Sequence, residues 1–504
     1  MSFQFRLSVR AALAVALINM TSGVLAAPAP FDVQSLALEG RVVTADFGDF
    51  NGDQRTDLMI TTLEGLPPAE TRTLHIYLRG DAKTFASTPS HRIRLPSGSA
   101  VYDIADVEDT PGDELILLRS AGLSVMSLAT AQGDVRDMAV TGPSTIAAAQ
   151  DERGFDRFAI AHADIGGRSR LLVPQLGALA ILELDGTQVA QLEVGGRANY
   201  YVTKPDSLVA VESDIQLFLD VPKISVGDVD GNGLRDVVSA TRHELRVFLS
   251  DERGQFDGAP DRILPLQLVD ERDHRRGSGG VVVSGGDHNN DGLMDLMITH
   301  VEGSFTDSIT TTRLYRNQGD GWQLETPTDT FDSKGAVSSD VLVDIDGDDT
   351  LELMRIRIKF SVLEIVEMLL TREVDAVISL HRLNDDGRYE TKPWSRRKVS
   401  TGISFETFRP NGFMPRGGVD LNADGLMDFV ASDNGKGIEV YLGGDKGPFQ
   451  KRRARQKLPT AGVIRFEDID GDGLPDFVLF DSQSFEPVVR IGRNTGALSA
   501  PQRQ

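Results

Sequence analysis

The chain has 504 residues, a formal net charge of −23 and no cysteine. The missing cysteines exclude disulfides and thiolate metal sites. The acidic balance argues against nucleic acid as a partner, because phosphates are bound by basic surfaces. A chain of this length can form several domains or one large repeat array.

The N-terminal segment, residues 1–26, predicts a secretory signal peptide. Arg6 and Arg10 precede an apolar run over residues 11–18, and Val24 and Ala26 place the cleavage site after Ala26. The alternative is a helix of the mature protein. No apolar segment reaches the roughly 18 residues that a membrane-spanning helix needs. We therefore expect no membrane span. The mature chain, residues 27–504, is expected to be secreted or periplasmic, and its source is expected to be a Gram-negative bacterium.

The first acidic loop, DFNGDQRTDL, has oxygen-bearing residues at its positions 1, 3, 5 and 9. These are Asp49, Asn51, Asp53 and Asp57, and Gln54 stands at position 6, where a glycine would allow a sharp bend. Alternate oxygen ligands followed by a late carboxylate suit a hard cation such as Ca²⁺. The sequence therefore predicts a calcium site here.

Five further loops repeat the pattern. Their ligand positions are Asp228, Asp230, Asn232 and Asp236; Asp287, Asn289, Asp291 and Asp295; Asp344, Asp346, Asp348 and Glu352; Asp420, Asn422, Asp424 and Asp428; and Asp468, Asp470, Asp472 and Asp476. In each loop the ninth residue leads into an apolar strand, whereas an EF-hand loop ends with Glu at position 12 and enters a helix. We expect strand–loop–strand sites that hold several structural Ca²⁺ ions, up to six.

Two degenerate copies begin at Asp106 and Asp164, where most ligand positions are lost, and we expect no metal there. With them, the first loop positions lie 48 to 76 residues apart along the chain. Each unit reads as four short antiparallel strands with polar turns, which is typical of a β-propeller blade. We predict an all-β propeller of about eight four-stranded blades, with seven as an alternative. Residues 32–38 are predicted to complete the last blade and close the ring.

The longest spacing, after Asp344, contains an insertion. Val362, Ile365, Val366 and Leu369 recur at helical spacing, so residues 361–371 are predicted to form an amphipathic helix. One interpretation is a helix packed on its own blade. The other is a partner-binding or membrane-surface helix, of which the membrane role fits less well because the polar face is acidic.

The repeated DxDGDGxxD loop followed by an apolar strand, together with the aromatic-and-glycine turn after it, resembles the FG-GAP/VCBS repeat family, which includes the propeller of integrin α chains. The likeness covers essentially the whole mature chain. It implies a propeller with Ca²⁺ in the loop that joins the first two strands of a blade, and it extends to the six intact loops only. Such propellers mostly serve as binding platforms, so the resemblance assigns no reaction.

No catalytic or cofactor-binding motif appears in the sequence, and we expect a non-catalytic scaffold that binds a protein or a glycan. Two alternatives remain open. One is a polysaccharide-active enzyme such as a calcium-dependent lyase, which would need converging Lys, Arg or Tyr beside the metal. The other is a subunit of an envelope complex, docked through the helix at residues 361–371.

Overall fold

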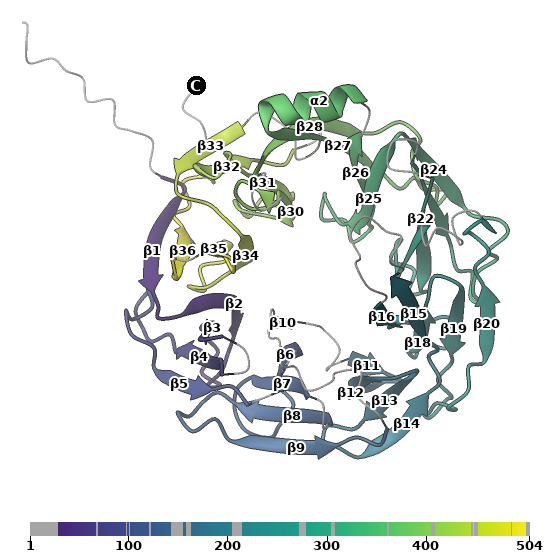
Figure 1. Ribbon diagram of the computed structural model, residues 1–504, viewed down its shortest axis with the longest axis horizontal. Helices are drawn as coiled ribbons and strands as arrows, with labels where there is room; N and C mark the ends of the chain where they lie inside the picture. The colour runs from purple at the N-terminus through teal and green to yellow at the C-terminus, as the bar shows by residue number, and fades with distance from the viewer. Residues whose placement is uncertain are drawn as a thin grey trace, which may run out of the picture.

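The computed structural model describes residues 29–499 except 67–68, 97, 100, 120–121, 143–154, 158–162, 204–213, 272–278, 304–307, 360–361, 405–408, 445–446, 448–451 and 485. The strands of these residues form nine sheets, of which eight are arranged as blades around a central axis (Figure 1) and the ninth is a separate two-stranded hairpin. The predicted eight-bladed all-β propeller is confirmed, and the seven-bladed alternative is wrong. The predicted signal peptide, residues 1–26, lies outside the described residues.

The first four blades follow one another in chain order. Blade 1 contains β2 (Arg41–Gly48), β3 (Asp57–Glu64), β4 (Thr71–Tyr77) and β5 (His91–Arg94). Blade 2 contains β6 (Val101–Ala105), β7 (Glu114–Arg119), β8 (Gly122–Ser127) and β9 (Val135–Ala139), with β10 (Asp156–Arg157) added parallel to β6. Blade 3 contains β11 (Ala163–Ile165), β12 (Arg168–Gln175), β13 (Ala178–Leu182) and β14 (Gln188–Leu192). Blade 4 contains β17 (Lys223–Gly227), β18 (Asp236–Ala240), β19 (Glu244–Phe248) and β20 (Arg262–Pro265).

The remaining blades keep the same order, with one exception in the last. Blade 5 contains β21 (Gly280–Gly286), β22 (Asp295–Glu302), β23 (Ile309–Tyr315) and β24 (Asp329–Lys334). Blade 6 contains β25 (Ala336–Val343), β26 (Glu352–Lys359), β27 (Glu373–His381) and β28 (Ser395–Ser404), with β29 (Arg409–Pro410) paired to β28. Blade 7 contains β30 (Arg416–Val419), β31 (Asp428–Ser432), β32 (Gly437–Tyr441) and β33 (Arg452–Lys457). Blade 8 contains β34 (Val463–Glu467), β35 (Asp476–Phe480), β36 (Val488–Asn494) and, as its fourth strand, β1 (Phe31–Ala37).

The second strand of each blade carries the apolar core. All five residues of β18 and all five of β35 are buried, because neighbouring blades cover both faces of this strand. The buried clusters form between sheets: Met59 of blade 1 packs in one cluster with Leu115 and Leu117 of blade 2. The core is therefore continuous around the ring, and each blade needs its neighbours.

The first strand of the chain closes the ring, as predicted. β1 pairs antiparallel with β36, from Phe31 opposite Asn494 to Ala37 opposite Val488. The Phe31 ring meets the Phe477 ring edge-on, with 5.0 Å between their centroids. Residues from the two ends of the sequence thus share one sheet.

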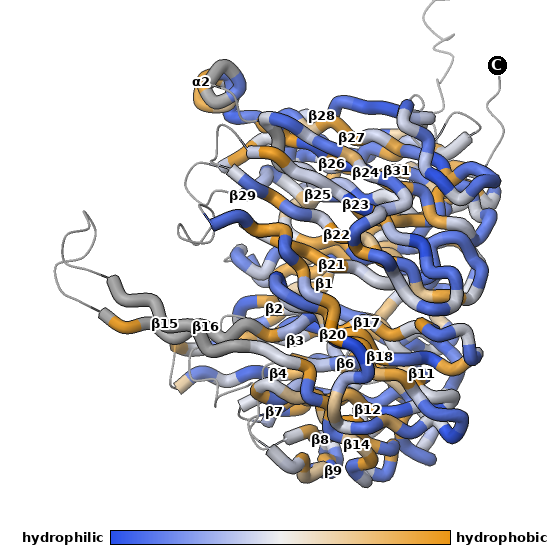
Figure 2. The backbone as a smooth tube through the Cα atoms, turned by 90° about the vertical axis from the view of Figure 1, so that its right-hand side faces the viewer, coloured by the Kyte–Doolittle hydropathy of each residue, from blue (hydrophilic) through white to orange (hydrophobic). Residues whose placement is uncertain are grey.

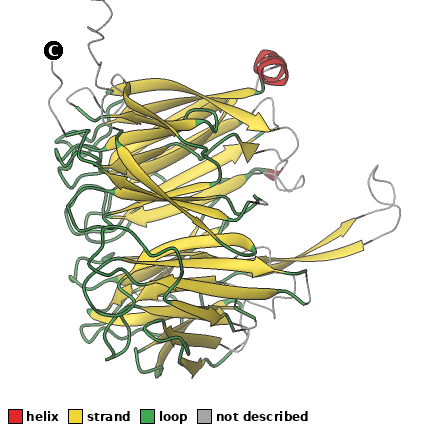
Figure 3. Cartoon of the chain, turned by 90° about the vertical axis from the view of Figure 1, so that its left-hand side faces the viewer, coloured by secondary structure: helices red, strands yellow, loops and turns green. Residues whose placement is uncertain are grey.

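The two ends of the ring differ. The loops that join first and second strands lie at one end, which we call the loop end (Figure 3). Antiparallel order places the connections between second and third strands, and between consecutive blades, at the other end. α2 (Val362–Thr371) joins β26 to β27 there, and β15 (Arg197–Thr203) and β16 (Asp214–Asp220) form a separate hairpin between blades 3 and 4. We call this the hairpin end.

α2 confirms the predicted helical insertion, although residue 361 lies outside the described part of the chain, and the exposed Val366 and Leu369 show that half of the predicted apolar face is not packed on the blade. The β15–β16 hairpin was not predicted. Within the described residues, no helix is long and apolar enough to cross a membrane.

Candidate metal-binding loops

The six intact loops share one backbone conformation. Each has eight residues, and the predicted ninth ligand is the first residue of the second strand. The first carboxylate turns the loop back on itself: Asp468 accepts the N–H groups of Gly471 at 2.8 Å and Gly473 at 2.9 Å. Position 6 takes a positive φ in every loop, including Gln54 (63°) and Asp349 (65°), which replace glycine. The loops without glycine therefore keep the same fold at a cost in strain.

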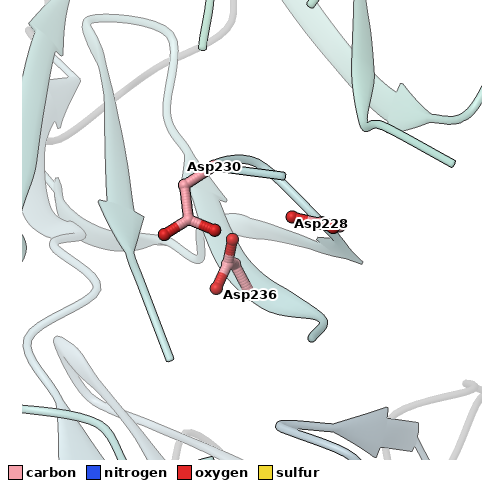
Figure 4. A group of neighbouring side chains, drawn as sticks. All are labelled: Asp228, Asp230 and Asp236. Atoms are coloured by element: carbon pink, nitrogen blue, oxygen red, sulfur yellow. The ribbon is translucent and has the colours of Figure 1, made fainter. Parts of the chain in front are cut away.

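Three of the loops bring carboxylates close together. Asp228, Asp230 and Asp236 each place an oxygen within 4.8 Å of the other two, and Figure 4 shows them converging from the loop and the start of β18. The same holds for Asp344, Asp346 and Asp348 and for Asp468, Asp470 and Asp476. Glu352 lies outside the second of these groups.

The other three loops have Asn at position 3, which supplies one fewer charge. There the amide Nδ2 donates to the carboxylate at position 5. The distances are 3.2 Å from Asn51 to Asp53, 2.8 Å from Asn289 to Asp291 and 2.9 Å from Asn422 to Asp424. This bond orients the amide and leaves the Oδ1 of Asn289 and Asn422 without a hydrogen-bond donor, whereas the Asn51 Oδ1 accepts the Asp53 N–H at 3.1 Å.

The side chain at position 3 carries a buried oxygen without a partner in four loops. The atoms are Oδ1 of Asn289, Asp346, Asn422 and Asp470, none of which meets a hydrogen-bond donor among the described residues. A buried polar atom left without a partner is costly. One equivalent atom in four independent loops points to a shared role, and a bound cation would satisfy it.

The carboxylate at position 9 fastens the loop to its blade. In all six loops it accepts the N–H of the position 2 residue, at 2.8 to 3.3 Å. Asp236 also accepts the Ser250 N–H at 2.8 Å, from the connection that follows the third strand, β19. This residue therefore serves a structural function besides any role as a ligand.

Burial makes the charged form of these position 9 groups costly. It raises the pKa of Asp57 and Asp476 to about 6, and the pKa of Asp295, Glu352 and Asp428 to about 7. Neighbouring loop carboxylates raise the pKa of these groups further. A cation would offset both effects.

The two degenerate loops each use an arginine that sequence reasoning missed. In blade 2, Arg136 Nε donates to Glu108 Oε1 at 2.7 Å, and its Nη2 donates to the Leu184 carbonyl of blade 3 at 3.2 Å. In blade 3, the buried Arg170 donates to the Gly254 carbonyl of blade 4 at 2.6 Å. Glu108 stands at ligand position 3, so here a guanidinium supplies the positive charge.

Neighbouring loops are hydrogen-bonded to one another. The Met294 N–H donates to the Asp228 carbonyl at 2.7 Å, and the Met427 N–H donates to the Ile345 carbonyl at 3.0 Å. Each bond joins the loop of one blade to the loop of the next. A change in the shape of one loop would therefore reach its neighbours.

A cleft of about 440 Å³ lies between β30 and β34. It is lined by Arg416, Phe466 and Glu467 and reaches the first carboxylates of two loops, Asp420 and Asp468. Arg416 and Glu467 are exposed and form no ion pair with any described residue. No sequence motif marked these residues, because their proximity depends on the packing of two blades.

The family model of the FG-GAP-like repeat matches residues 228–298 and 420–499. This chain carries FG-GAP-like repeats. The two matched regions contain four of the six intact loops in full, those beginning at Asp228, Asp287, Asp420 and Asp468. The resemblance drawn from the repeated loops is confirmed at the level of these repeats.

Two solved structures match this chain, both at low sequence identity and low TM-score. One concerns specific recognition of non-reducing terminal N-acetylglucosamine by a lectin of Agrocybe aegerita. The match has 12% sequence identity and a TM-score of 0.37, and it covers 94% of this chain and 97% of the lectin chain. The other is the Dos1 propeller. That match has 8% sequence identity and a TM-score of 0.35, and it covers 93% of this chain and 96% of the Dos1 chain. No curated protein matches this chain.

Proposed function

We propose that this protein is a calcium-stabilised β-propeller that acts outside the cytoplasm as a non-catalytic scaffold for a protein or glycan ligand. The observation that supports the calcium role best is the set of four unpartnered oxygens at position 3, in loops where carboxylates converge. Every proposed ligand is a carboxylate or amide oxygen, which is the donor set of Ca²⁺ rather than of a softer metal.

The ions would be structural. Without a cation each loop crowds three or four carboxylates at one end of the ring, where like charges repel. Binding would remove this repulsion and, through the hydrogen bonds between loops, hold the loop end in one shape. The repeats support the scaffold role, and the signal peptide predicted at residues 1–26 supports a location outside the cytoplasm.

The loop end and its cleft are the proposed binding surface. Arg416, Phe466 and Glu467 combine a free cation, an aromatic ring and a free carboxylate beside two of the loops. This combination suits the hydroxyl groups and apolar face of a sugar, or a polar protein segment. Calcium at Asp420 and Asp468 would fix the shape of the cleft.

The calcium proposal is tested by metal content and melting. The mature protein should retain several equivalents of Ca²⁺ after dialysis, and EGTA should lower its melting temperature. An unchanged melting temperature in EGTA, together with no bound calcium, would contradict the proposal.

The scaffold proposal is tested by screening the protein against glycans and envelope proteins, with Ca²⁺ and then with EGTA. Retention that needs calcium and is lost in Arg416→Ala would support the cleft. Retention that persists in that variant would place the ligand elsewhere. New ultraviolet absorbance from unsaturated products on an acidic polysaccharide would replace the scaffold with a lyase.

A further inference from the structure

The carboxylates of Asp346 and Asp470, at position 3 of their loops, each have two oxygens in different surroundings. In both residues Oδ1 is buried and meets no hydrogen-bond donor among the described residues. The other oxygen lies beside basic side chains. Arg382 Nη2 donates to Asp346 Oδ2 at 2.9 Å. Lys83 Nζ donates to Asp470 Oδ2 at 3.2 Å, and Arg493 Nη1 lies 3.8 Å from the same oxygen. Each carboxylate is therefore held by one oxygen and offers the other.

Arg382 and Arg493 occupy the same place in their blades. The residue after ligand position 9 lies opposite His381 in blade 6 and opposite Gly492 in blade 8, and the arginine comes next in the chain. Blade 5 also has an arginine there, Arg316, but position 3 of its loop is an asparagine whose amide donates to its own loop. The blades of the three other intact loops have leucine at this place: Leu78, Leu249 and Leu442. The strand itself therefore does not require an arginine.

A tryptophan fixes the guanidinium of Arg382. Arg382 follows the last residue of β27, which pairs with β26 (Figure 2). Its guanidinium carbon lies 3.7 Å from the centroid of the Trp394 ring. The backbone N–H of Trp394 donates to the Leu380 carbonyl at 2.8 Å, which anchors this tryptophan to β27. A planar guanidinium stacked on a ring has few orientations left, so its hydrogen bond holds the Asp346 carboxylate in one orientation.

Given the calcium role proposed for these loops, we propose that Arg382 is a positioning residue for the ion in the loop of blade 6. It holds Oδ2 of Asp346 so that Oδ1 faces the cation. A carboxylate that is already oriented loses less freedom when it binds a metal, and partners of this kind commonly contribute about 10- to 100-fold to metal affinity. The equivalent contacts of Asp470 in blade 8 support this role, because they repeat it at a second loop.

The charge of Arg382 acts in the opposite direction. A guanidinium repels a nearby cation, so removal of Arg382 would tighten calcium binding if charge were the main effect. The side chain of Arg382 is 38% exposed, and water close to it weakens this repulsion. The hydrogen bond to Asp346 is direct. We therefore expect orientation to outweigh repulsion, and the sign of the change in calcium affinity distinguishes the two effects.

Luminescence of Tb³⁺ can report on this loop separately from the others. Tb³⁺ accepts the same oxygen ligands as Ca²⁺, and it emits when an excited tryptophan close to it transfers energy. Trp394 lies beside the loop of blade 6, stacked on Arg382, whereas Trp322 lies in blade 5 and donates to the Met294 carbonyl. The emission that is lost in Trp394→Phe therefore comes from the loop of blade 6. Added Ca²⁺ displaces Tb³⁺, and the midpoint of this displacement gives the calcium affinity of the loop.

Arg382→Met should weaken calcium binding by this loop about 10- to 100-fold. Arg382→Lys, which keeps the charge and a donor but not the planar fork, should restore part of the affinity. The control is Arg388→Met, which removes an exposed arginine from the same connection that lies beside Asp329 rather than beside a loop carboxylate. It should bind calcium like the wild type. Mass spectrometry of the dialysed variants should show unchanged calcium in the other loops, which establishes that they are folded.

Two results would overturn the positioning role. One is an Arg382→Met protein whose blade 6 loop binds calcium as tightly as the wild type or more tightly, since the guanidinium would then act at most as a charge. The other is equal weakening by Arg382→Met and Arg388→Met, since the contact with Asp346 would then not matter. A wild-type protein that binds neither Tb³⁺ nor Ca²⁺ is a separate result, which contradicts the calcium role of the loops and, with it, the role of Arg382.

Discussion

Arg465 of β34, in the last blade, donates a hydrogen bond to Asp46 of β2, in the first. Asp46 is buried and also accepts a hydrogen bond from Tyr102 of blade 2. One carboxylate therefore joins three consecutive blades on the inner wall of the ring, across the point where the ring closes.

Removal of the Asp46 carboxylate should lower the stability of the fold substantially. In Asp46→Ala, the guanidinium of Arg465 and the Tyr102 hydroxyl lose their shared acceptor, so we expect a loss of about 3 kcal/mol in the free energy of unfolding. Urea unfolding measures this loss. The control is Asp81→Ala, which removes an ion pair between Arg55 and an aspartate side chain that is 94% exposed; it should change stability by less than about 0.5 kcal/mol. Equal effects would contradict a special role for Asp46.

The closing strand, β1, should contribute to the stability of the fold mainly through its buried aromatic residue, Phe31. Phe31→Ala leaves a cavity beside Phe477, and we expect a loss of about 3–5 kcal/mol. Asp32→Ala in the same strand removes only a surface ion pair with Arg493 and should be nearly neutral. Thermal melting compares the two. A Phe31→Ala protein that melts at the wild-type temperature would show that β1 is not part of the last blade.

One loop substitution should remove one calcium ion. Asp470→Ala deletes a proposed ligand with an unpartnered oxygen, so the content of bound Ca²⁺ should fall by one equivalent, as measured by mass spectrometry of the dialysed protein. Glu108→Ala, at the matching position of a degenerate loop, should leave the calcium content unchanged. Loss of calcium in both variants would mean that the degenerate loop also binds an ion.

The metal-free protein should become less stable as the pH rises. The position 9 carboxylates have folded-state pKa values raised from 3.8 or 4.5 to about 6 or 7, so folding favours their protonated forms. Stability in EGTA is therefore expected to fall between about pH 4 and pH 7. Calcium, which favours the charged forms, should reduce this dependence or reverse it. Melting temperatures at several pH values, with and without Ca²⁺, test both parts.

The arginine of blade 2 should act independently of calcium. Arg136→Ala breaks the bond to Glu108 and the bonds to blade 3, and we expect a loss of about 1–2 kcal/mol. The loss should be the same in Ca²⁺ and in EGTA, unlike that of Asp470→Ala. A loss seen only with calcium would show that blade 2 depends on an ion.

Much of the fold could be predicted because each loop marks a fixed point in its blade. The residue at position 9 begins the second strand in all six intact loops. One motif therefore predicted the order of strands within a blade, the length of the repeat and the placement of all the loops at one end of the ring. The closing role of β1 followed from a last unit that lacked a fourth strand.

The additions between blades could not be predicted in the same way. The β15–β16 hairpin lies within a spacing of 64 residues, close to the usual period, and its apolar residues resemble those of any blade strand. Arg136 and Arg170 reach across blade boundaries, and no local pattern identifies the partner of a long side chain. The cleft beside Arg416 likewise depends on how two blades pack.

The antiparallel pairing of β1 with β36 also decides how the molecule would respond to force. Phe31 lies opposite Asn494, so the outer ends of the two strands meet at the same end of the pair. Tension applied to the two termini would peel these strands apart one hydrogen bond at a time, rather than shear all of them together. The β1–β36 pairing should therefore separate at low force. The blades should unfold only at higher force, because a continuous core joins each blade to its neighbours.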